Sequence, residues 1–201
     1  MNLLLKDIED SMPVVLHPPP MTDDEYFEFC QQYEGVRIER MSDGSVVFMA
    51  PAGLETGFRN SRLAQRLGAW AERDGRGCAF DSNTEYILHD GSALSPDASW
   101  VFRDKIEQLS SKQKRIFPRL CPDFVIELMS PSDRLRDVKK KMQQWIGNGV
   151  RLGWLIDPDR RTVIVYRPET EPETIVDAER VSGEGPVTGF VLELEDIWAG
   201  L

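Results

Sequence analysis

The sequence has few residues of the kinds that build metal–thiolate sites or disulfide frameworks. Its 201 residues include only three cysteines and two histidines. Cys30, Cys78 and Cys121 are scattered and show no C-x-x-C spacing, so neither a zinc site nor a disulfide set is expected. We therefore predict three free, buried thiols.

Long hydrophobic runs are also missing. No apolar segment approaches the roughly 20 residues that a membrane-spanning helix needs. Residues 1–10 contain three consecutive leucines and then acidic residues, which is too short an apolar stretch for a signal peptide. These two absences predict a cytoplasmic protein with no membrane segment.

The composition is that of an ordinary globular protein, with 41% hydrophobic and 29% charged residues. The net charge of -10 argues at first against nucleic acid as a partner. The charge is uneven, however. Residues 103–161 hold 14 Lys and Arg against 8 Asp and Glu, whereas residues 1–102 hold 8 against 17 and residues 162–201 hold 2 against 9. The basic middle is either a solvated face or a strip that faces phosphates, and both interpretations stay open.

Hydrophobic periodicity predicts helices that alternate with strands. Thr22 and Glu25 have the spacing of a capping box, which begins a helix that runs to about residue 34. A second helix is predicted over 55–73, a short one within 105–118, and another from a cap at 130–133 to about 147. The predicted strands are 36–40, 46–50, 78–80, 84–88, 98–102, 124–129, 153–156, 162–166 and 190–194.

This order predicts one α/β domain over residues 1–201, with a central mixed sheet flanked by helices. Neither an internal repeat nor a linker divides the chain. We place the core at about 22–167 and regard 168–201 as an acidic C-terminal strand region.

Two carboxylates stand out against their apolar surroundings. Glu127 interrupts the apolar run 124–129, which is typical of a central strand with both faces buried. Asp97 precedes another strand. A buried, unpaired carboxylate is costly, so Glu127 either pairs with a buried Arg or Lys or faces a cation. Carboxylates from neighbouring strands can bind magnesium together, and the spacing alone leaves both alternatives open.

The helix after Glu127 adds candidate lysines. Its apolar stripe leaves Lys140 pointing to solvent, with Lys139 and Lys141 on the two flanks of the stripe. Either flanking lysine could reach back toward Glu127 to position or deprotonate a water. A solvated helix face is the other interpretation of the triplet.

Several blocks together resemble the Uma-type restriction endonuclease family of the PD-(D/E)xK nuclease superfamily. They span roughly residues 41–167. The blocks are Ser95–Val101, Cys121–Asp133, Lys141–Gly149 and Gly153–Pro158, with an earlier block at Pro51–Asn60.

The resemblance implies a restriction-endonuclease-like fold and a metal-dependent DNA endonuclease. It assigns Asp97 and Glu127 as catalytic acids and metal ligands, Lys141 as the catalytic lysine, and Glu55 as a further metal ligand. It also implies Mg²⁺, with Mn²⁺ as a substitute, DNA as substrate, and by analogy a homodimer.

This sequence departs from the superfamily at one point. The usual lysine lies two residues after the second acid, where this chain has Met129. Catalysis then depends on Lys141 reaching the same point from the helix. The alternative is an inactive nuclease-fold protein that binds nucleic acid or a protein partner.

Overall fold

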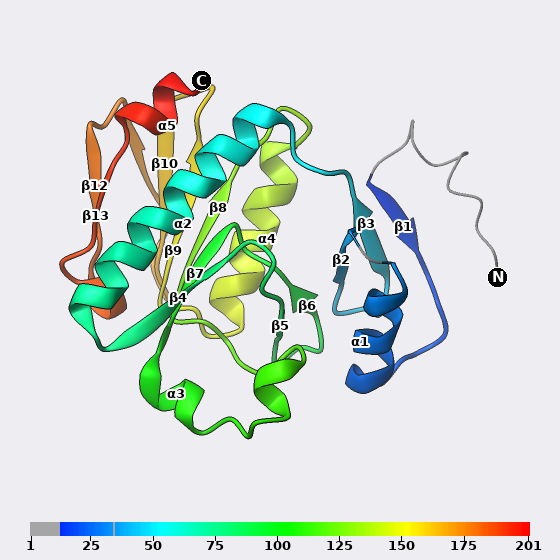
Figure 1. Cartoon of the computed structure of the whole chain (residues 1–201). Helices are drawn as coiled ribbons and strands as arrows, with labels where there is room; N and C mark the ends of the chain where they lie inside the picture. The colour runs from blue at the N-terminus through cyan, green and yellow to red at the C-terminus, as the bar shows by residue number, and fades with distance from the viewer. Residues whose placement is uncertain (1–12, 34) are drawn as a thin grey trace.

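The computed structural model describes residues 13–33 and 35–201 (Figure 1). The prediction that residues 1–10 contain no signal peptide lies outside this range. Within it, no helix is both long and apolar enough to span a membrane.

The centre of the molecule is a six-stranded mixed sheet. Its order is β11-β10-β9-β8-β7-β4, and β8 and β9 form its parallel pair while the other neighbours are antiparallel. The strands are β4 (Gly77–Asp81), β7 (Ala98–Phe102), β8 (Phe124–Leu128), β9 (Leu152–Asp157), β10 (Thr162–Tyr166) and β11 (Glu173–Val176). The predicted α/β class with a mixed sheet is confirmed.

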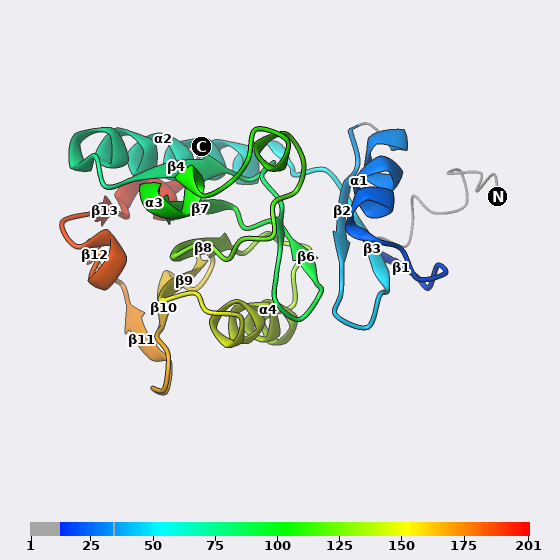
Figure 2. The ribbon, with the colours of Figure 1, turned by 90° about the horizontal axis from the view of Figure 1, so that it is seen from below.

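Helices cover both faces of this sheet. Helix α2 (Leu54–Asp74) lies on one side and α4 (Leu135–Gly147) on the other, as the view along the layers shows (Figure 2). Successive side chains of β8 point to opposite faces of the sheet, so this strand packs against both α2 and α4. Phe124, Ile126 and Leu128 pack toward α2, whereas Val125 packs toward α4. Glu127 has the parity of Val125, so it too points toward α4.

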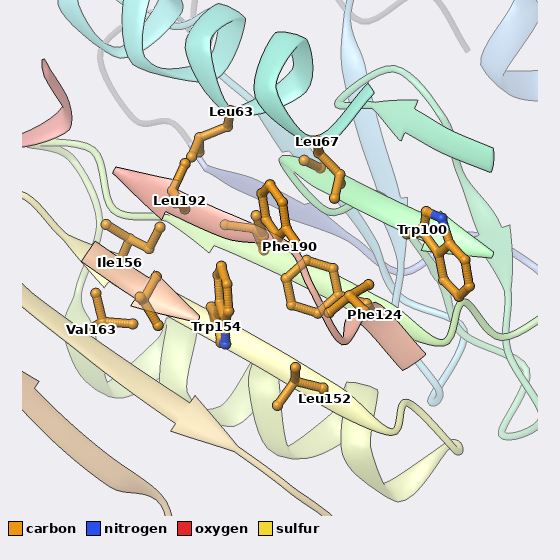
Figure 3. Close-up of a cluster of buried hydrophobic side chains, with 14 of the residues drawn as sticks. Leu63, Leu67, Trp100, Phe124, Leu152, Trp154, Ile156, Val163, Phe190 and Leu192 are labelled. Carbon is orange, nitrogen blue, oxygen red and sulfur yellow. The ribbon is translucent and has the colours of Figure 1, made fainter. Parts of the chain in front are cut away.

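The core on the α2 side extends beyond the predicted limit at 167. Phe190 and Leu192 are buried there against Trp154 and Phe124, as Figure 3 shows. They belong to the segment that holds β12 (Arg180–Ser182), β13 (Val191–Glu193) and α5 (Glu195–Ala199). Alternate residues of this acidic segment are apolar, and these complete the core.

A second sheet lies beside the first. Its order is β1-β3-β2-β6-β5, with strands β1 (Val14–Leu16), β2 (Arg37–Arg40), β3 (Val46–Met49), β5 (Tyr86–Ile87) and β6 (Ala93–Leu94). Helix α1 (Asp23–Gln32) packs on it (Figure 1). The predicted capping box is present: the Glu25 amide donates to Thr22 Oγ1, and the Thr22 amide donates to the Glu25 carboxylate.

Three local predictions need correction. The Ser130–Asp133 segment does not cap α4. Instead the Asp133 carboxylate accepts hydrogen bonds from the amide and the hydroxyl of Ser130, which closes the turn at 130–133. Helix α4 begins at Leu135. The predicted helix within 105–118 is two short turns, α3 (Arg103–Glu107) and a 3₁₀ turn at Gln113–Arg115. The three cysteines are free but only half-buried.

Glu85 is a buried carboxylate between α1 and the second sheet. It accepts a hydrogen bond from the Tyr26 hydroxyl at 2.8 Å. Burial raises the pKa of Glu85 to about 8, although the hydrogen bond from Tyr26 opposes the shift. The folded protein therefore holds a proton on Glu85 over a pH range in which the unfolded chain has lost it.

Stability should consequently fall as pH rises from about 4.5 to 8, by up to about 1.4 kcal/mol per pH unit from this group. Glu85→Gln keeps the acceptor without the titration. We expect the variant's free energy of unfolding in urea, relative to wild type, to rise from pH 5 to pH 8. Glu28→Gln, at an exposed position of α1, is the matched control. A constant difference for Glu85→Gln would show that Glu85 is ionised in the folded protein.

Candidate active site

Glu127 is buried on the α4 side of β8 and is paired from that helix. Its Oε1 accepts from Trp145 Nε1 at 2.8 Å and lies 3.0 Å from Lys141 Nζ. Lys141 and Trp145 are four residues apart, so they share one face of α4. Of the two alternatives left by the sequence, the pairing of Glu127 with a buried lysine is thus present.

Asp97 lies beside Glu127 at the end of the β7–β8 ladder, just past the Ala98–Ile126 pair. Its amide donates to the Ile126 carbonyl at 3.0 Å, and its Oδ2 accepts from the Leu128 amide at 2.7 Å. Asp97 therefore holds the backbone on both sides of Glu127. The two carboxylates are close enough that the charge of Asp97 helps to raise the pKa of Glu127, and their joint binding of a cation stays a prediction.

Lys141 reaches the site from α4, as one of the two flanking lysines was predicted to do. Its ammonium donates to Glu39 Oε1 at 2.8 Å and to the Ser95 carbonyl at 2.9 Å, besides pairing with Glu127. Lys139 and Lys140 are exposed. The helix thus directs one lysine of the triplet inward and leaves two at the surface.

Glu39 and Arg37, both from β2, complete the cluster. Glu39 is buried and also accepts from the Ser95 amide at 3.0 Å. Arg37 lies 3.4 Å from Asp97 Oδ1 and donates to the Ser95 carbonyl, with about a third of its side chain exposed. Three carboxylates and two cations leave the cluster one negative charge, which a divalent cation and a phosphodiester together would neutralise.

The electrostatics follow from burial and crowding. Burial raises the pKa of Glu127 to about 7; the ammonium of Lys141 opposes this shift, and the neighbouring charges of Asp97 and Glu39 add to it. Burial by itself would lower the pKa of Lys141, but the carboxylates of Glu127 and Glu39 raise it. Lys141 is therefore a protonated ammonium here, suited to orienting a water rather than deprotonating it.

Glu55 is not brought to this cluster. Its carboxylate pairs with Arg59 Nη2 at 2.9 Å, and Arg59 in turn donates to the Ile197 carbonyl at 2.8 Å. Among the hydrogen bonds and ion pairs of the described residues, Glu55 has none with Asp97 or Glu127. Its predicted role as a metal ligand is thus without support from these contacts.

Asp123 follows Pro122 and lies directly before β8, four residues before Glu127. It pairs with Lys105 Nζ at 2.8 Å and accepts from the Phe102 amide at 3.0 Å. Other residues of the basic middle also pair within the chain, among them Lys112 with Asp24. Part of the basic excess is therefore already paired within the chain.

The cluster would offer a divalent cation only a few oxygen ligands from side chains. In residues 13–33 and 35–201, no three or more His, Cys, Asp or Glu side chains are grouped as a metal site. Magnesium, however, is usually bound through one or two carboxylates while keeping several waters. Asp97 and Glu127 fit that description.

Sequence reasoning missed Arg37 and Glu39. They alternate with apolar residues in the segment 36–40, a pattern typical of a strand with one solvated face. The one available signal is that Arg37 and Glu39 share strand parity, so both point to the same side. The contact that covers this side comes from Ser95 and Lys141, far along the chain.

The chain is an α/β protein with a mixed sheet between helices, and Glu127 and Lys141 are paired beside Asp97 at the end of the β7–β8 ladder. The sequence model of the Uma2 family, described as "Putative restriction endonuclease", matches residues 23–195, so the chain belongs to this family.

A crystallised protein from Anabaena variabilis, titled a putative nuclease of DUF820, has a similar fold. The TM-score is 0.69 at 23% identity, over 90% of this chain and 98% of that one. A weaker similarity is to a DrdV–DNA complex, with a TM-score of 0.39 and 17% identity over 61% of this chain and 10% of that chain. No curated protein matches.

Proposed function

We propose that this protein is a divalent-metal-dependent endonuclease that hydrolyses phosphodiester bonds of DNA at the Asp97–Glu127–Lys141 cluster. The observation that carries the proposal is the ammonium of Lys141, 3.0 Å from Glu127, in a chain whose superfamily lysine position is Met129. A lysine from the following helix thereby pairs with the second acid.

The residues have distinct roles in this proposal. Asp97 and Glu127 would hold the cation, which would compensate charge on the phosphodiester and lower the pKa of a water. Lys141 orients the attacking water and stabilises charge that develops on the phosphate. Arg37, which is partly exposed beside Asp97, is suited to bind a phosphate oxygen through its planar guanidinium.

Binding of the DNA backbone is assigned to the exposed basic residues on α4 and just before it. Lys139 and Lys140 are exposed next to Lys141, and Arg134 precedes the same helix. Charges of this kind make affinity strongly salt-dependent without specifying sequence. A two-fold dimer, expected by analogy, would cut both strands, whereas a monomer would nick one.

The test is metal removal and replacement. The purified protein is incubated with supercoiled plasmid, single-stranded DNA and branched DNA, in Mg²⁺, in Mn²⁺ and in chelator. We expect nicked or linear product with metal, none with chelator, and recovery when metal is added back. Calorimetry measures cation binding in parallel.

Each outcome has a defined meaning. Failure to cut any substrate in either metal, together with no cation binding, would overturn the proposal. Cation binding without cleavage would favour the alternative, an inactive nuclease-fold protein. A salt-dependent shift of DNA on a gel would then distinguish a nucleic-acid binder from a protein that binds another protein.

A further inference from the structure

Asn60 lies on α2 and faces the candidate site. Its Nδ2 donates to Asp97 Oδ1 at 3.2 Å. Its Oδ1 is buried from solvent and accepts no hydrogen bond from any residue in the described part of the chain. Buried amide oxygens nearly always have a partner, so this oxygen has a lone pair free beside Asp97 to accept a hydrogen bond or bind a cation.

A hollow that can hold water lies beside Asn60 and Asp97. A hollow of about 390 Å³ is lined by Asn60 and Asp97, with Gly57, Ser61, Asp81 and Ser82 around them. A water molecule takes up roughly 30 Å³, so the hollow holds several. A Cβ at Gly57 would meet nothing within 4 Å, so no side chain from that turn of α2 fills the space.

Glu55 cannot serve this space from its present position. Glu55 and Asn60 are five positions apart, which places them about 140° from each other around the helix. Glu55 Oε1 lies against Arg59 and next to Gly200, at the C-terminal turn. Of the two candidate side chains on α2, only Asn60 contacts Asp97.

We propose that Asn60 Oδ1, not Glu55, is the ligand that α2 provides to a divalent cation held by Asp97 and Glu127. Amide carbonyls, carboxylates and waters are oxygen ligands that suit Mg²⁺ and Mn²⁺. The inference rests on the proposed function, because it presumes that the cluster binds a cation. It assigns a neutral ligand to a cation that Asp97 and Glu127 would hold.

The test measures Mn²⁺ affinity directly, from the electron paramagnetic resonance signal of free Mn²⁺, without an activity assay. Asn60→Leu has a similar size and no oxygen, and it should weaken Mn²⁺ binding about tenfold or more. Asn60→Asp keeps an oxygen and should bind as tightly as wild type or more tightly. Glu55→Gln is the matched control on the same helix and should stay within about twofold of wild type.

The outcomes distinguish a wrong assignment of Asn60 from a wrong proposed function. Circular dichroism and thermal unfolding without metal show whether each variant is folded, and Asn60→Asp still tests the ligand if Asn60→Leu does not fold. If wild type binds Mn²⁺ and Asn60→Leu binds it equally well, the assignment of Asn60 is wrong. The same follows if Glu55→Gln or Asn60→Asp weakens binding. In each of these cases the proposed function still stands. No Mn²⁺ binding by wild type overturns the proposed function, and the inference with it.

Discussion

Replacing Asp97 by asparagine is expected to lower the rate of metal-dependent DNA cleavage by about a thousandfold. The substitution keeps the size of the side chain and an acceptor for the Leu128 amide, which lies 2.7 Å from Oδ2. It removes the negative charge that would hold the cation. The two cations already in the cluster, Arg37 and Lys141, would then face only two carboxylates, which disfavours a third positive centre.

The measurement is the initial rate of plasmid nicking over a range of Mg²⁺ and Mn²⁺ concentrations. A variant that has lost a ligand should bind the cation more weakly, so part of the activity should return at high Mn²⁺. Asp123→Asn is the matched control, because Asp123 is also a buried aspartate after a proline but pairs with Lys105. It should reduce stability and leave the rate of the folded protein close to wild type.

Equal losses of rate in the Asp97 and Asp123 variants would contradict the assignment, since they would show a general response to the loss of a buried carboxylate. Full activity of Asp97→Asn would show that the cleaving site lies elsewhere or that the activity belongs to a contaminant. Thermal unfolding of each variant separates loss of fold from loss of chemistry.

The part of the site that could be predicted lies in contiguous motifs. Asp97 and Glu127 are conspicuous because each is a charged residue at or in an apolar strand. The periodicity of α4 places Lys139 and Lys141 on the two flanks of its apolar stripe and leaves both open, and only the family resemblance singles out Lys141. These are local patterns of 3.6 and 2 residues, and they are legible without a structure.

Glu39, Arg37 and Asn60 could not be predicted in the same way. Each lies in an element whose pattern is that of an ordinary surface strand or helix. Their roles depend on β2 and α2 meeting the end of the β7–β8 ladder, through contacts such as the 2.8 Å bond from Lys141 to Glu39. Such contacts join residues 37 to 102 positions apart, and no local propensity encodes them.

The same distinction applies to the fold: elements with a clear local pattern could be predicted, and elements without one could not. The predicted strands 124–129 and 162–166 correspond closely to β8 and β10, because their apolar runs bury both faces. The short strands β6 and β12 have two or three residues each, too few to establish a period, whereas β5 lies within the predicted strand 84–88. The C-terminal strand region 168–201 falls outside the predicted core, because its buried residues, such as Phe190 and Leu192, lie among many acidic and polar neighbours.

Replacing Lys141 by alanine is expected to lower cleavage by about 10² to 10³-fold at saturating metal. The ammonium bridges Glu39 and Glu127 at 2.8 and 3.0 Å, so its removal takes away the donor that would orient water at the phosphate. It also leaves two buried carboxylates facing each other without their cation. A divalent cation can compensate that charge, so Mn²⁺ affinity should be kept or increased while the rate falls.

This opposite change in affinity and rate distinguishes a catalytic lysine from a structural one. A lysine that merely held the fold would, on removal, lower stability, cation affinity and rate together. Lys140→Ala is the matched control: it is the preceding residue on α4, carries the same charge and is exposed. It should leave the rate at saturating DNA unchanged and weaken only salt-dependent DNA binding. Unchanged cleavage by Lys141→Ala would mean that the water is oriented by another group, and Arg37, next to Asp97, would be the first to replace.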